Sequence, residues 1–132
     1  MTRDKKRYIE ALFYNYKKNK ARLEILQLGL ISEDDFILNS IDYSKEKIQN
    51  SNLSSLDNQI IAREKEIERL KRDIKLTEIL LDSLNERDRL VISKFYIENI
   101  SNIKIAEMID RVDLKTVWRI KDIAIMNMAN LI

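Results

Sequence analysis

The sequence contains no cysteine, no histidine and no proline among its 132 residues, and it has a single glycine, Gly29. Without cysteine and histidine the chain lacks thiolate nucleophiles, disulfides, the usual zinc ligands and the commonest general base. These absences argue against an enzyme, and we expect neither a cofactor nor a metal site. Without proline, and with one glycine, the chain also lacks the residues that tight hairpin turns require. The composition therefore predicts an all-α protein.

Long apolar runs are absent as well. No stretch approaches the roughly 18 apolar residues that a membrane-spanning helix needs. The basic residues between Thr2 and Arg7 are followed by an amphipathic stretch rather than by the apolar core of a signal peptide. We therefore expect a cytoplasmic protein without a membrane partner. Its length suits one ordinary domain, or a small domain carried on a helical stalk.

The net charge of +2 conceals a basic N-terminal arm. Between Thr2 and Arg22, eight basic residues stand against two acidic ones, Asp4 and Glu10. Such an arm suits a polyanion, and a solvated, lysine-rich helix face is the alternative. The sequence leaves both interpretations open.

A long amphipathic helix is predicted from about Asp4 to Leu28. Its apolar seam has alternating spacings of three and four residues, which is typical of a helix that buries one stripe. The seam consists of Ile9, Leu12, Tyr16, Asn19, Leu23, Leu26 and Leu30. Asn19, its one polar member, either fixes the register against a partner helix or lies partly exposed at the edge of the stripe.

After Gly29, the serine and acidic residues of 32–35 resemble a helix start, and a short helix is expected to reach about Asn39. The stretch 41–55 is rich in Ser, Asn and Lys and has no helical period, so we predict a loop there. Ser54 or Ser55 is then expected to cap a second long helix.

Heptad spacing characterises that second long helix. Ile60, Ile67, Ile74 and Leu81 recur every seven residues, and Leu70, Thr77 and Leu84 lie three residues after the last three of them. This pattern is typical of a coiled coil. The simplest packing is a long antiparallel helical hairpin over residues 1–83, and a homodimer through either N-terminal helix remains open.

Residues 84–132 are predicted to form a compact three-helix, helix-turn-helix domain. Its first helix runs from Leu84 to Tyr96, its second covers 105–109, and the turn 110–113 offers Asp110 for a left-handed residue and Asp113 as the N-cap of the third helix. Ala106 is small enough to let the third helix cross closely over the second. The expected inward residues are Val91, Ile92, Phe95 and Tyr96 in the first helix, and Val117, Ile120, Ala124, Met128 and Leu131 in the third.

The same segment resembles region four of bacterial sigma factors, the domain that reads the upstream promoter element. The resemblance rests on Leu84, Glu86, Arg87, Val91, Ile92, Tyr96, Ser101, Ile105, Ala106, Glu107, Thr116 and Val117. The whole chain, including 13–17 and 43–48, is similar to sigma-related phage late-transcription regulators of the ArpU and RinA type. This likeness implies a sequence-specific, DNA-binding transcription regulator of phage or prophage type in a bacterial host cell, acting at promoters with RNA polymerase.

The resemblance also implies which residues touch double-stranded DNA. The third helix would enter the major groove, with Leu114, Lys115, Trp118 and Arg119 as candidate base readers. The candidates for phosphate contacts are Ser101, Asn102, Lys104, Arg111, Thr116 and Lys121. For Trp118, packing against a neighbouring helix is the alternative.

Two other functions fit the same sequence features. A phage small terminase subunit also couples a helix-turn-helix to oligomerising helices, but it binds packaging DNA and forms a ring. An adaptor could instead occupy RNA polymerase without touching DNA. Neutralising the third helix would leave such an adaptor active.

Overall fold

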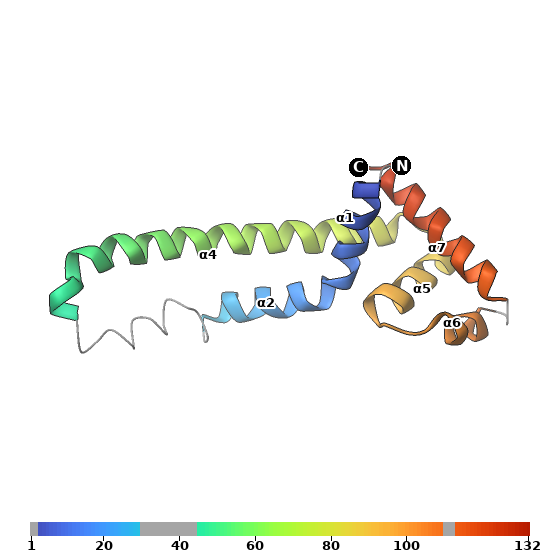
Figure 1. Cartoon of the computed structure of the whole chain (residues 1–132), viewed down its shortest axis with the longest axis horizontal. Coiled ribbons are helices and arrows are strands. Elements are labelled where there is room, and N and C mark those ends of the chain that lie inside the picture. The colour runs from blue at the N-terminus through green and yellow to red at the C-terminus, as the bar shows by residue number, and fades with distance from the viewer. Residues whose placement is uncertain (1–2, 30–44, 110–112) are drawn as a thin grey trace. The chain divides into compact units, whose positions relative to one another are not determined.

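The computed structural model describes residues 3–29, 45–109 and 113–132, and their side chains except over 45–56. The chain is all-helical over these ranges, which confirms the predicted fold class at that level. Figure 1 shows the elements in chain order. They are α1 (Arg3–Tyr14), α2 (Tyr16–Leu28), α4 (Lys45–Asp82), α5 (Glu86–Ile92), the π-helical segment η1 (Ser93–Ile97), α6 (Asn102–Met108) and α7 (Leu114–Ala129). In the described ranges, no helix is long and apolar enough to cross a bilayer.

The first predicted helix exists, but a turn at Asn15 divides it into α1 and α2. Asparagine is among the weaker helix formers, which is the local reason for a break at this point. Gly29 ends α2 with a left-handed φ of 67°, and its N–H donates to the carbonyls of Ile25 and Leu26 at 3.2 and 3.3 Å. Glycine is the residue that adopts this conformation without steric cost.

The loop predicted over 41–55 is wrong from Lys45 onward, because α4 begins there. Ser54 and Ser55 consequently lie inside the helix and do not cap it. Extending an existing helix by one residue costs far less than nucleating one, so a stretch of mediocre helix formers can remain helical beside a strong one. Residues 41–44, the short helix expected over 32–39 and the seam residue Leu30 lie outside the described residues.

The helices gather into two compact units, and their boundaries differ from the predicted division at residues 83 and 84. Unit 1 comprises Met1–Lys17 with Asp73–Ile132, and unit 2 comprises Lys18–Arg72. The N-terminal helix α1 therefore belongs to the same unit as the C-terminal helices. Sequence periodicity identified the buried stripe of α1 but not what covers it.

Unit 1 contains two hydrophobic clusters. The first joins α1 to the end of α4, to η1 and to the second half of α7, and its members include Ile9, Leu12, Phe13, Leu80, Leu84, Ile92, Tyr96, Ala124, Ile125 and Met128. In Figure 1, α1 lies beside the C-terminal end of α7. The second cluster joins α5, α6 and the first half of α7, and it consists of Val91, Ile105, Ala106, Ile109, Val117 and Ile120.

Most of the predicted inward positions of this unit are buried, and one is not. Val91, Ile92, Tyr96, Val117, Ile120, Ala124 and Met128 are confirmed as buried. Phe95 is partly buried and packs against both clusters. Leu131 is 62% exposed, so its prediction is wrong; α7 ends at Ala129 with Asn130 as its C-cap, and the 3.6-residue period cannot extend past that end.

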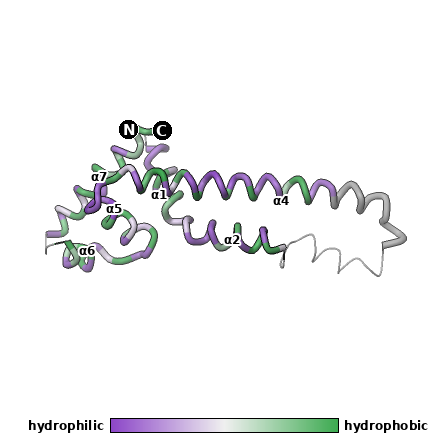
Figure 2. Tube along the Cα trace, turned by 180° about the vertical axis from the view of Figure 1, so that it is seen from behind, coloured by the Kyte–Doolittle hydropathy of each residue, from purple (hydrophilic) through white to green (hydrophobic). Residues whose placement is uncertain are grey.

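Unit 2 contains the part of α2 from Lys18 and the part of α4 up to Arg72. Arg22 Nε and Glu66 Oε1 form an ion pair of 3.1 Å across these two helices. Leu26 and Leu70 are buried, whereas Asn19 and Leu23 are half-buried. Figure 2 shows that the described length of α4 is mostly hydrophilic, with hydrophobic residues recurring along it.

Candidate nucleic-acid interface

The N-terminal ends of α6 and α7 are closed by side-chain caps. Asp113 is the N-cap of α7, as predicted, and its Oδ1 accepts from the backbone N–H and from the hydroxyl of Thr116, each at 2.8 Å. These two bonds, the backbone one first, lower the pKa of Asp113. Ser101 caps α6 by accepting from the N–H of Lys104 at 3.4 Å. Such caps fix where each helix begins and so which side chains form its exposed first turns.

The predicted base readers lie on the first turns of α7. Lys115, Trp118 and Arg119 are exposed, Trp118 by 49%, and Leu114 is half-buried. Spacings of three and four residues place Lys115, Trp118 and Arg119 on one face of the helix. Asp122, also exposed, follows on that face one turn later. The positive part of the face is therefore confined to the N-terminal half of α7.

A groove runs beside this face, between the start of α5, the end of α6 and α7. One hollow of ≈ 410 Å³ is lined by Glu86, Arg87, Leu90, Met108, Ile109, Thr116 and Ile120. A second hollow, of ≈ 220 Å³, is lined by Arg87, Asp88, Thr116, Arg119, Ile120 and Ile123. Arg87, Thr116 and Ile120 line both, so the two hollows are neighbours. Arg87 of α5 and Arg119 of α7 thus converge on one hollow.

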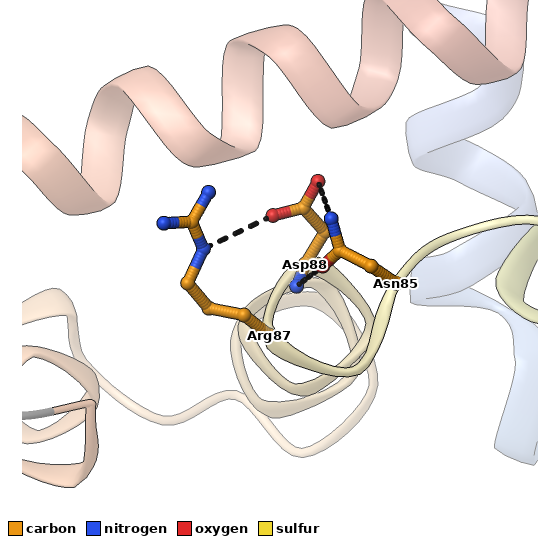
Figure 3. Close-up of polar contacts among 3 residues, drawn as sticks. All are labelled: Asn85, Arg87 and Asp88. Atoms are coloured by element: carbon orange, nitrogen blue, oxygen red, sulfur yellow. Dashed lines mark hydrogen bonds and ion pairs between the residues drawn. The ribbon is translucent and has the colours of Figure 1, made fainter.

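Asp88 is the buried charge of this groove, with 7% of its surface exposed. Its backbone N–H donates to Oδ1 of the N-cap Asn85 at 2.8 Å, and Asn85 Nδ2 donates back to Asp88 Oδ2 at 3.4 Å. The first bond caps the helix, the second joins the two side chains, and a carboxylate in the first turn is also favoured by the helix dipole. Figure 3 shows the carboxylate directed toward α7, with Arg87 Nε 3.4 Å from Asp88 Oδ1.

Arg87 was not among the predicted contact residues. It formed part of the sequence likeness to sigma region four, but sequence alone did not indicate that it lines the same hollow as Arg119. Its side chain is 62% exposed although its Nε pairs with Asp88. The guanidinium therefore has surface left for an anionic ligand.

The predicted phosphate contacts differ in their surroundings. Lys104 is exposed. Asn102 is half-buried, and its Oδ1 has no hydrogen-bond partner among the described residues. The hydroxyl of Thr116 donates to Asp113. Arg111, like Asp110, lies outside the described residues.

Lys121 is the predicted phosphate contact with the least favourable geometry. Its Nζ lies 3.4 Å from the centroid of the Phe95 ring, which places the ammonium over the aromatic face. Burial lowers the pKa of this lysine. The ammonium is directed at the protein's own surface in this arrangement, so a structural contact describes Lys121 better than the predicted phosphate contact does.

In the basic N-terminal arm, Lys5 has a structural role. Its Nζ donates to the carbonyl oxygens of Ala129 and Ile132 at 3.4 and 2.9 Å. A cation at the C-terminal end of a helix satisfies carbonyls that lack intrahelical partners. Arg3 and Arg7 are also exposed, as are Lys17, Lys18 and Lys20 farther along the arm.

No protein-family model, no curated protein and no solved structure matches this chain. The likeness to sigma region four and to phage late-transcription regulators stays a prediction from sequence.

Proposed function

We propose that this protein is a sequence-specific, double-stranded-DNA-binding regulator of transcription, built as a helical hairpin followed by a helix-turn-helix. The observation that carries the proposal is the exposed face of α7. Lys115, Trp118 and Arg119 stand on it directly after a capped N-terminus. A helix that begins with exposed basic and planar side chains suits the major groove, where base edges are read by side chains near the helix N-terminus.

Each side chain of this face has a distinct role in the proposal. Arg119 forms a bidentate contact with O6 and N7 of a guanine, the commonest specific pairing in the major groove. Lys115 contacts a neighbouring guanine or phosphate, and Trp118 contacts a thymine methyl group, with Leu114 beside it. Lys104 and the capped start of α6 lie against the phosphate backbone and set the register.

Arg87 extends the proposed interface beyond the two helices. It lines the same hollow as Arg119, and its pairing with Asp88 holds its Nε toward α7. A guanidinium in this position suits a backbone phosphate flanking the bases that α7 reads. The action at promoters with RNA polymerase, in a phage or prophage context, rests on the sequence likeness alone.

Substitution of the two basic base readers tests the proposal. Lys115→Ala and Arg119→Ala should each weaken binding to a preferred duplex by roughly 1–3 kcal/mol and relax the sequence preference at one position. Lys75→Ala is the matched control, because Lys75 is an exposed lysine on α4 and belongs to no part of the proposed interface. Fluorescence anisotropy with preferred and scrambled duplexes measures both effects. Equal affinity and selectivity for all four proteins would contradict the proposal.

A further inference from the structure

One face of α4 combines exposed isoleucines with two opposite charges. Ile60, Glu64, Ile67, Lys71 and Ile74 follow one another at alternating spacings of four and three residues, so they form one stripe on the helix. Ile60 is 41% exposed, and Ile67 and Ile74 are half-buried. We call these five residues the outer stripe.

The outer stripe borders the surface that α4 buries within this chain, because Leu70 lies three residues after Ile67 and four residues before Ile74. Arg22 of α2 pairs with Glu66, and the buried leucine of this part of α4 is Leu70. On a helix of 3.6 residues per turn, Glu66 and Leu70 lie on one flank of the stripe. The residues of the described chain form no ion pair with Glu64 or Lys71. The stripe therefore has one exposed isoleucine, Ile60, two half-buried isoleucines, and two charges that no described residue pairs.

The order of residues along the stripe specifies the partner that complements it. The apolar members are symmetric about Ile67, whereas the charges are of opposite sign on its two sides. In an antiparallel pair of such helices centred on Ile67, Ile60 meets Ile74, Ile67 meets its own counterpart, and Glu64 meets Lys71 twice. A parallel pair would instead place like charges opposite each other, which is unfavourable.

We infer that the outer stripe is an interface between two copies of this chain, which associate as an antiparallel, two-fold symmetric dimer through α4. A two-fold interface is self-complementary, and the stripe has that property in both its apolar and its charged residues. The dimer does not depend on the proposed DNA binding. If both hold, the DNA site has two half-sites that are related by symmetry.

Cysteine crosslinking tests the centre of this interface, because the natural chain contains no cysteine. Ile67→Cys should form a disulfide-linked dimer under mild oxidation, since residues on the two-fold axis can reach the short Cα separation that a disulfide requires. Ile61→Cys is the matched control: Ile61 is 49% exposed on the same helix but lies off the stripe. Equal crosslinking of the two variants, or none at position 67, would overturn the inference.

Charge reversal tests the register without oxidation. Glu64→Lys should weaken dimerisation about tenfold or more, because the introduced ammonium would face Lys71 of the other copy. Combining Glu64→Lys with Lys71→Glu restores opposite charges and should restore the dimer. Sedimentation equilibrium without DNA measures the dimer, and circular dichroism verifies that each variant is helical. A wild-type monomer at all concentrations, or a double variant as weak as the single one, would overturn the proposed interface while leaving the proposed function untouched.

Discussion

Replacing Ala106 by leucine should destabilise the unit that carries the proposed DNA-binding face. Ala106 is 7% exposed and packs with Ile105, Val117 and Ile120, which are 0%, 0% and 5% exposed. Leucine adds three carbons where this cluster leaves little room. Overpacking of this kind costs roughly 1–3 kcal/mol in free energy of unfolding. For a unit of this size, that loss lowers the melting temperature by roughly 5–20 °C.

Thermal unfolding followed by circular dichroism measures this effect, and Ala11→Leu provides the control. Ala11 lies on α1 in the same unit, but its side chain is exposed. Exposed substitutions usually change the free energy of unfolding by no more than about 0.5 kcal/mol. If Ala106→Leu melted at the same temperature as Ala11→Leu, Ala106 would not lie at a close helix contact.

Two further substitutions test contacts that sequence did not predict. Tyr96→Phe removes a hydrogen bond of 3.1 Å from the Tyr96 hydroxyl to Glu10 and should cost about 1–2 kcal/mol at neutral pH. Burial, aided by Glu10, raises the pKa of Tyr96 above its usual 10.0, so above that pH the unfolded chain loses a proton that the folded chain keeps. The free energy of unfolding should therefore fall as the pH rises past about 10. Urea titrations at several pH values should show a shallower fall for Tyr96→Phe than for the wild type. Equal dependence on pH in the two proteins would refute the role given to Tyr96. Lys121→Met should lower the free energy of unfolding yet leave the slope of log DNA affinity against log salt unchanged. If Lys121 instead contacted a phosphate, its loss would flatten that slope by about 0.9.

Local features of the fold were readable because they depend on short stretches of sequence. The N-cap Asp113 needs only a small acidic residue before an apolar periodic run, and the burial of Val117, Ile120 and Ala124 follows from helical spacing. The helical start of α4 was missed, because the composition of 45–55 gives no periodic signal. Leu131 was misplaced, because periodicity does not report where a helix stops.

Long-range features of the site depended on packing that sequence does not encode locally. The approach of Arg87 to Arg119 joins residues of α5 and α7 through a groove that only the folded unit forms. The position of Lys121 over Phe95 has the same origin. Sequence suggested a DNA contact for Lys121 and none for Arg87. In the folded unit, a residue of another helix determines the surroundings of each: Phe95 for Lys121 and Arg119 for Arg87.

The proposed function requires that this chain select a DNA sequence. Repeated selection from a pool of random duplexes, followed by anisotropy titration of the enriched duplex at fixed salt, measures this directly. We predict one enriched sequence that binds at least about 10³-fold more tightly than a scrambled duplex, with the preference lost in Arg119→Ala. A folded protein that enriches no sequence, or that binds enriched and scrambled duplexes equally, would contradict the proposed function.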